Sequence, residues 1–277
     1  LRENLQKKGY VFQTATDTEV LLACYEEWGV DALEHLNGMF AFIIYDMAKK
    51  RRFAVRNRFG IKPLYYWISP KGTLAFFSEI KQLTALPEWK ATLNGQSGYD
   101  FLAFGACDMT HATLFHGVYQ LGGGEYLYLD TEKPFQPGQQ LPCETWYTIS
   151  LDQNIVDYDE CARIFYELLS RSVEYRLRSD AQTGAALSGG LDSSSIVSLA
   201  NRVKNREDNP FDLHTYTICS KDPEYDEREY AEKVLDPKVN RAHWIYPQVD
   251  NLFDVMDRLI WHQDEPFPTT SIFAEWS

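Results

Sequence analysis

The sequence predicts an α+β first half followed by an α/β second half with a parallel sheet. Short aromatic and β-branched runs follow one another at hairpin spacing between residues 37 and 77, which is typical of an antiparallel sheet. After residue 157, apolar runs alternate with segments of helical periodicity, which is typical of βαβ units. A stretch rich in Pro, Gln and Gly at residues 131–142 closes the first half. We therefore expect two domains, residues 1–150 and residues 151–277.

Size and charge limit the classes of function. With 277 residues and 44% hydrophobic content, the chain is long enough for two domains with real cores. A formal net charge of −13 leaves no basic surface for nucleic acid or an anionic membrane, so neither partner is expected. The longest apolar run, residues 40–45, is far shorter than the roughly 20 residues of a membrane helix, and no signal peptide heads the chain. These features predict a cytoplasmic protein.

The first half begins with a helix and continues with strands. Thr16 and Glu19 have the spacing of a capping box, so a helix should begin there, with Asp17 complementing the helix dipole. Residues 37–46 and 51–56 predict a β-hairpin, and two further strands at 64–67 and 73–77 extend it into one antiparallel sheet. Ser78 is the expected cap of the next helix.

Two other features of the first half have simple structural explanations. Arg56, Arg58 and Lys62 could form an anion site, but such charges are more often solvated or paired. The three glycines at residues 122–124 lie between strands with no helix after them, which favours a turn over a phosphate loop. The five cysteines lack C-x-x-C spacing and predict neither a zinc site nor disulfides.

The second half should contain helices at residues 157–178, 226–234 and 252–262. Strands are expected at residues 183–186, 213–219 and 242–246. In parallel sheets, ligands lie at the carboxyl ends of the strands. The first and second of these strands end at the segment 187–194 and at Ile218, so we expect the ligand site there.

The sequence Leu-Ser-Gly-Gly-Leu-Asp-Ser-Ser at residues 187–194 joins a strand to a helix. Glycines allow close approach of the backbone to a ligand, and the free N–H groups of a first helical turn favour a phosphate. Asp192 fits beside a phosphate if Mg²⁺ lies between them. A Walker A loop would need a lysine that is missing here. A glycine turn capped by serine is the alternative, but folding alone does not require so many polar residues in one turn.

The segment 188–193 resembles the pyrophosphate loop of the N-type ATP pyrophosphatases, and its flanks resemble the synthetase domain of the glutamine-hydrolysing asparagine synthetases. The resemblance implies a Rossmann-like parallel sheet on which a carboxylate attacks the α-phosphorus of ATP, releasing pyrophosphate, before ammonia displaces AMP. It implies Mg²⁺ at Asp192, and adenine or ribose contacts at Leu187 and Ile218. The implied ATP-binding residues are Leu187, Ser188, Gly189, Gly190, Asp192, Ser193, Ser194 and Ile218.

The first half resembles the later part of class II glutamine amidotransferase domains, through residues 37–41 and 58–66. The fold implied is the N-terminal-nucleophile sandwich of two sheets between helices. Residues 16–19 resemble the Ser-Asp-x-Glu stretch of that family, which implies that Asp17 holds the α-amino group of glutamine. The family's nucleophile is an amino-terminal cysteine, and the chain begins with Leu1. We expect a fragment that lacks both ends and does not hydrolyse glutamine, and the catalytic residue is unassigned.

The expected function is ATP-dependent amidation of aspartate to asparagine, with ammonia from glutamine. One alternative is a related cyclase of the lasso-peptide or β-lactam synthetase type, and another is a non-catalytic scaffold. The residues that select the carboxylate substrate would lie beyond Ser277. A homodimer is a possible assembly. Residues 264–271 carry two acids and three hydroxyls, which could meet pyrophosphate or a substrate amine, or cap the next helix.

Overall fold

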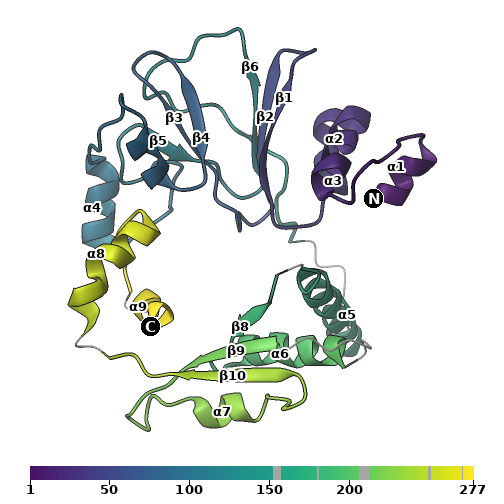
Figure 1. Ribbon diagram of the computed structural model, residues 1–277, viewed down its shortest axis with the longest axis vertical. Coiled ribbons are helices and arrows are strands. Elements are labelled where there is room, and N and C mark those ends of the chain that lie inside the picture. Colours follow the sequence, from purple (N-terminus) through teal and green to yellow (C-terminus); the bar gives the residue numbers. More distant parts are fainter. Residues whose placement is uncertain (152–156, 180, 206–212, 249–250, 270) are drawn as a thin grey trace. The chain divides into compact units, whose positions relative to one another are not determined.

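A computed structural model describes residues 1–151, 157–179, 181–205, 213–248, 251–269 and 271–277. Its contacts divide the chain into two compact units (Figure 1). Unit 1 is Leu1–Ser150 together with Asp264–Pro268, and unit 2 is Leu151–Gln263 together with Thr269–Ser277. Within the described part of the chain, no helix combines the length and the apolar character needed to cross a bilayer.

Unit 1 contains two antiparallel sheets. One has the order β1-β2-β6-β7, and the other has the order β4-β3-β5. The strands are β1 (Ala41–Asp46), β2 (Arg51–Arg56), β3 (Tyr65–Ile68), β4 (Leu74–Phe77), β5 (Val118–Gln120), β6 (Glu125–Asp130) and β7 (Glu144–Thr145).

The two predicted hairpins exist, but the expectation of one sheet from the first four strands was wrong. The β1-β2 hairpin and the β3-β4 hairpin belong to different sheets, because β2 pairs with β6 and β3 pairs with β5. Hairpin spacing determines which strands pair locally. It carries no information on which distant strand covers the other edge of each hairpin.

The glycines at residues 122–124 form a turn between strands, as expected, and this turn carries the chain from one sheet to the other. Gly124 has a positive φ of 72°, which favours glycine. A Cβ on Gly123 would lie 2.8 Å from the backbone nitrogen of Gly60. Close backbone packing therefore explains Gly123 and Gly124.

The helical elements of unit 1 are α1 (Arg2–Lys7), α2 (Asp17–Trp28), η1 (Gly29–Asp31), α3 (Ala32–His35), η2 (Ile80–Ala85) and α4 (Gly95–Phe104). Helix α2 begins at the predicted place without the predicted capping box. Glu19 accepts hydrogen bonds from the backbone N–H groups of Gln13 and Thr14, both at 2.8 Å, and Thr16 makes no side-chain cap. Glu19 therefore holds the segment before the helix through residues 13 and 14, and it does not accept a hydrogen bond from the cap residue Thr16.

The predicted cap at Ser78 was also wrong. The backbone N–H of Ser78 donates to Gln82, and the first N–H groups of η2 belong to Ile80 and Lys81. They donate to the carboxylate of Asp264 at 2.6 and 3.1 Å. An acid far along the chain thus satisfies donors that a local hydroxyl was expected to satisfy.

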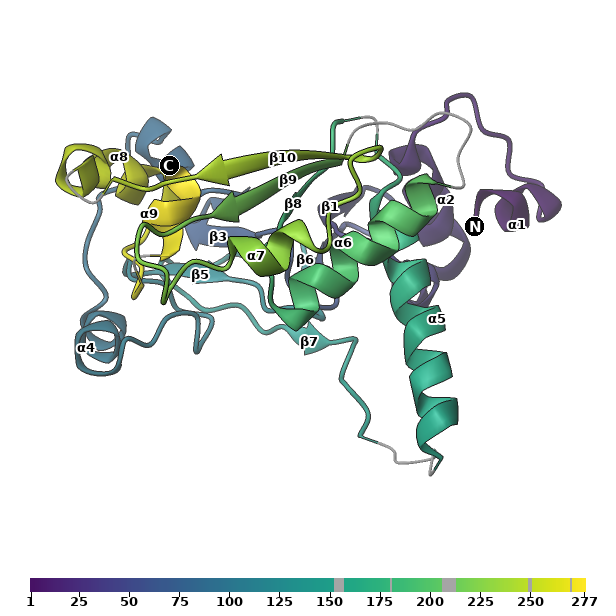
Figure 2. The same cartoon turned by 90° about the horizontal axis from the view of Figure 1, so that it is seen from below.

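Unit 2 contains a parallel sheet with the order β10-β9-β8, as predicted. Its strands are β8 (Gly184–Ala186), β9 (Leu213–Ile218) and β10 (Asn240–Ile245), and Figure 2 shows β9 and β10 running side by side in the same direction. The helices are α5 (Tyr158–Arg176), α6 (Leu191–Lys204), α7 (Arg228–Glu232), α8 (Leu252–Gln263) and α9 (Ser271–Trp276). The core includes Leu187, Val197 and Leu213.

Candidate functional site

The candidate site is the turn between β8 and α6, at the carboxyl end of a parallel strand. Gly189 has a positive φ of 81°, and Gly190 is the N-cap residue of α6. Ser193 ties the turn together, because its Oγ accepts from the N–H of Ser188 at 3.2 Å and lies 3.0 Å from the Oγ of Ser188. The turn is therefore a preformed loop, shaped by its own hydroxyls.

The amino end of α6 offers hydrogen-bond donors. No described residue accepts a hydrogen bond from the backbone N–H of Leu191, Asp192 or Ser193. These groups lie at the positive end of the helix dipole, where an anion is stabilised. The side chain of Asp192 is exposed and makes no ion pair or hydrogen bond with the described residues. Donors for a phosphate and a carboxylate for a cation are thus available in one turn.

Helix α7 packs against this turn. A Cβ on Gly189 would lie 2.8 Å from the Cβ of Tyr230 and 3.1 Å from both the N of Ala231 and the O of Glu227. The acidic stretch at residues 222–227 leads directly into α7, so the chain brings it beside the loop. The sequence did not predict this packing, because neither Gly189 nor Tyr230 shows a periodic signal that would mark the contact.

Leu187 and Ile218 lie at the same end of the sheet and differ in exposure. The Leu187 side chain is 1% exposed and belongs to the core. Its N–H donates to the carbonyl of Tyr216 at 2.9 Å, and its carbonyl accepts from Oγ1 of Thr217 at 2.7 Å. Ile218 is 43% exposed at the end of β9. Ile218 therefore has free apolar surface for a base, whereas Leu187 mainly holds the loop on the sheet.

Two buried oxygen atoms have no hydrogen-bond partner among the described residues: Oγ of Ser194, in the loop segment, and Oδ1 of Asp226, just before α7. The other oxygen of Asp226 accepts from Nε of Arg228 at 2.7 Å, and that hydrogen bond holds the pKa of the carboxyl below its usual range. Asp226 is therefore ionised at neutral pH.

The remaining predicted residue, Asp17, belongs to unit 1 and not to the unit that carries this turn. It is the exposed first residue of α2 in unit 1, and no described side chain pairs with it. Its predicted role toward glutamine stays a prediction.

Two of the three basic residues considered as an anion site, Arg56 and Arg58, bind the backbone of unit 1. The guanidinium of Arg56 donates to the carbonyls of Gly60, Lys62 and Leu121 at 2.6 to 2.8 Å. Arg58 donates to the carbonyl of Leu36 and lies 5.0 Å from the ring centre of Trp146. These contacts occupy both arginines in holding the loop at residues 57–63.

The acids at residues 264 and 265 also have structural partners in unit 1. Asp264 accepts from the first turn of η2 and forms an ion pair with Nζ of Lys81 at 3.1 Å. Glu265 accepts from the N–H of Leu114 at 2.5 Å. Of the hydroxyls that follow, Thr270 lies outside the described residues.

Comparisons with known proteins match both halves. Residues 1–137 match the model of the glutamine amidotransferase domain, and residues 165–276 match the model named asparagine synthase. The chain belongs to the glutamine-hydrolysing asparagine synthetase family.

Several curated relatives have similar identity to the chain. Asparagine synthetase [glutamine-hydrolyzing] 3 of Bacillus subtilis is 30% identical over 88% of this chain and 38% of its own length. Asparagine synthetase [glutamine-hydrolyzing] 1 of the same organism is 29% identical over 96% of the chain and 40% of its own length. Amidase chyE of Penicillium rubens is 27% identical over 94% of the chain and 39% of its own length. The chain thus spans less than half the length of these relatives.

Proposed function

We propose that the complete protein is an ATP-dependent ligase that converts aspartate to asparagine with ammonia taken from glutamine. Family membership and the names of the Bacillus subtilis relatives support this proposal. The observation that carries it is the turn at residues 187–194, with its free N–H groups and Asp192 at the carboxyl end of a parallel strand. Residues 1–150 would form the amidotransferase domain and residues 151–277 the start of the synthetase domain.

The loop residues have complementary roles in this proposal. The N–H groups of residues 191–193 and the hydroxyls of Ser188 and Ser193 would bind the phosphates of ATP. Asp192 would hold Mg²⁺, which neutralises phosphate charge and favours release of pyrophosphate. The loop suits both ligands because its backbone donors and its one exposed carboxylate are unpaired among the described residues. Ile218 would contact the base with its exposed side chain.

The proposed reaction has two steps. The substrate carboxylate attacks the α-phosphorus of ATP, which forms an aspartyl-adenylate and expels pyrophosphate. Ammonia then attacks the acyl carbon, and AMP leaves with the acyl oxygen. Binding of pyrophosphate to the helix end would stabilise the charge that develops on the leaving group in the first step.

The amidotransferase domain would supply the ammonia. Asp17 would bind the α-amino group of glutamine, and its exposure on the first turn of α2 leaves its carboxylate available. The nucleophile of that reaction is not assigned to any residue of this chain. A homodimer and a cytoplasmic location stay predictions.

A second candidate function is a related enzyme that adenylates another carboxylate. The relative named Amidase chyE shows that this similarity extends beyond proteins named asparagine synthetase. Incubating the complete protein with ATP and either glutamine or ammonia separates the two candidates. Formation of AMP and asparagine that requires aspartate supports the first, and AMP formation only with another carboxylate supports the second.

The nucleotide site can be tested on the 277-residue chain by isothermal titration with ATP and Mg²⁺. Asp192→Asn should weaken Mg²⁺-dependent ATP binding by about tenfold or more, because one unit of charge opposite the cation is lost. The control is Asp159→Asn, an acid in the first turn of α5 in the same unit, which should leave binding unchanged. Equal affinity for wild type and the Asp192 variant, or no binding by the complete protein, would support the non-catalytic scaffold instead.

A further inference from the structure

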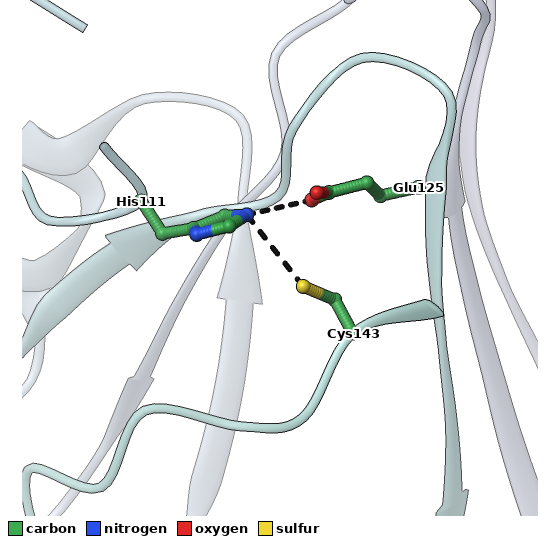
Figure 3. Close-up of side chains that lie close together, drawn as sticks. All are labelled: His111, Glu125 and Cys143. Atoms are coloured by element: carbon green, nitrogen blue, oxygen red, sulfur yellow. Dashed lines mark hydrogen bonds and ion pairs between the residues drawn. The ribbon is translucent and has the colours of Figure 1, made fainter. Parts of the chain in front are cut away.

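Three side chains in unit 1 that bear metal-binding atoms converge on one point (Figure 3). They are His111, Glu125 and Cys143. Nε2 of His111 lies 2.7 Å from Oε2 of Glu125 and 3.5 Å from Sγ of Cys143, and all three ligand atoms lie within 4.8 Å of one another. The predicted nucleotide and glutamine residues include none of them.

The backbone holds each of these residues in place. The carbonyl of His111 accepts from the N–H of Gln120 at 2.8 Å. Glu125 is the first residue of β6, and Cys143 precedes β7, which pairs with β6. The cluster therefore joins three separate segments of the chain on a paired sheet edge.

Gly122 leaves room for the glutamate. Its N–H donates to Oε2 of Glu125 at 2.8 Å, and a Cβ at this position would lie only 2.6 Å from that oxygen. With a side chain at residue 122, the carboxylate would have to shift from the place that it has in the cluster. Neither the nucleotide site nor the glutamine site uses this turn.

The contacts do not have the arrangement of a catalytic triad. In a triad, one ring nitrogen faces the nucleophile and the other faces the acid. Here Glu125 and Cys143 both face Nε2 of His111, as Figure 3 shows. The donor atoms of residues that share a cation must lie close to one another, as these three do.

We propose that His111, Glu125 and Cys143 bind a zinc ion in unit 1. One imidazole, one carboxylate and one thiolate form a donor set that suits Zn²⁺ and does not suit Mg²⁺ or Ca²⁺. Bond lengths of about 2.3 Å to sulfur and 2.0 Å to nitrogen at a tetrahedral angle place these two atoms about 3.5 Å apart. The Sγ to Nε2 distance is 3.5 Å. Glu125 would move back slightly as its hydrogen bond to Nε2 is replaced by the metal.

Gln140 can orient the histidine. Nδ1 of His111 lies 3.4 Å from the side-chain amide nitrogen of Gln140. Turning that amide would present its oxygen to an Nδ1–H group, which fixes the tautomer whose Nε2 is free to bind a metal. The side chains of His111 and Glu125 are 30% and 16% exposed, so water can occupy the fourth position. Zinc would then link residues 139–145 to β6 and to the turn at residues 122–124.

The test uses the 277-residue chain after treatment with a chelator. Zn²⁺ is titrated in competition with a chromophoric chelator, and Co²⁺ is used as a spectroscopic probe. The wild type should bind one equivalent of zinc, and its Co²⁺ complex should show the absorption band of a thiolate ligand. Cys143→Ser and His111→Ala should weaken zinc binding by more than about tenfold and remove that band in the cysteine variant.

Two exposed residues provide matched controls: His116→Ala and Cys161→Ser should bind zinc as the wild type does. Glu125→Gln is a further variant, because its amide oxygen can still accept from Gly122 while its affinity for zinc falls. It keeps the test decisive if a ligand deletion unfolds the chain. Zinc binding that is absent in the wild type, or equal in the wild type and the three ligand variants, would overturn the proposal.

Discussion

At the scale of single residues, Gly189 determines whether the candidate nucleotide loop can form. Its φ of +81° strains any other residue, and a Cβ would collide with Tyr230 at 2.8 Å. Gly189→Ala should therefore lower the free energy of unfolding by about 1–3 kcal/mol and weaken ATP binding. Urea unfolding and isothermal titration measure the two effects.

The control for this prediction is Gly95→Ala. Gly95 is the first residue of α4, and a Cβ there has no neighbour within 4 Å. This variant should keep the wild-type stability within about 0.5 kcal/mol. If Gly189→Ala also kept the wild-type stability, the result would contradict the close packing of α7 on the loop.

Glu265 is a residue whose charge state should affect stability. Burial raises the pKa of its carboxyl above the ordinary value, against the opposing effect of its hydrogen bond from Leu114. The folded state therefore binds this proton more tightly than the unfolded state does. The contribution of Glu265 to stability should fall as pH rises from the unfolded pKa through the folded pKa, and then stay constant.

Glu265→Gln tests this pH dependence. The amide oxygen can still accept from Leu114, but the side chain no longer titrates. The free energy of unfolding of the variant should lack the decrease that ionisation of Glu265 causes in the wild type. The difference in this free energy, variant minus wild type, should therefore grow as pH rises across that interval. Unfolding midpoints in urea at a series of pH values measure the difference, and parallel curves for the two proteins would contradict the prediction.

At the scale of elements, the start of η2 depends on a residue that is distant in sequence. Asp264 accepts hydrogen bonds from Ile80 and Lys81, and its own φ is +66°. Asp264→Ala should cost about 1–2 kcal/mol, because it removes the acceptor and places alanine in the left-handed region. Asp264→Asn should cost less, since asparagine tolerates this conformation and keeps one acceptor. Thermal unfolding compares them, and equal losses would argue against a capping role.

Elements were predictable where their signals are local. The β1-β2 and β3-β4 hairpins, α2, α5 and the alternating strands and helices of unit 2 follow from periodicity and spacing. The caps of α2 and η2 and the division of the strands between two sheets did not follow. A cap can come from any acceptor that the fold brings near, and sheet edges pair over long separations, so neighbouring residues do not encode them.

At the scale of the whole molecule, the two proposed ligands belong to different units. Mg²⁺-ATP should slow amide hydrogen exchange at residues 187–194 in unit 2, because it would bind their free N–H groups. Zinc should slow exchange at residues 111–125 and 139–145 in unit 1. Mass spectrometry of exchanged peptides measures both effects on one sample. Protection by ATP confined to unit 1 would contradict the nucleotide assignment.

The sequence alone determined the family, the order of β-rich and βαβ halves, and the loop that is the candidate phosphate site. These properties reside in contiguous residues, whose spacing and backbone preferences act locally. Only the tertiary structure brought Asp264 to the start of η2, α7 to Gly189, and His111, Glu125 and Cys143 to one point. Such groupings depend on the path of the chain through two sheets, because atoms that meet in space come from segments with no common sequence pattern.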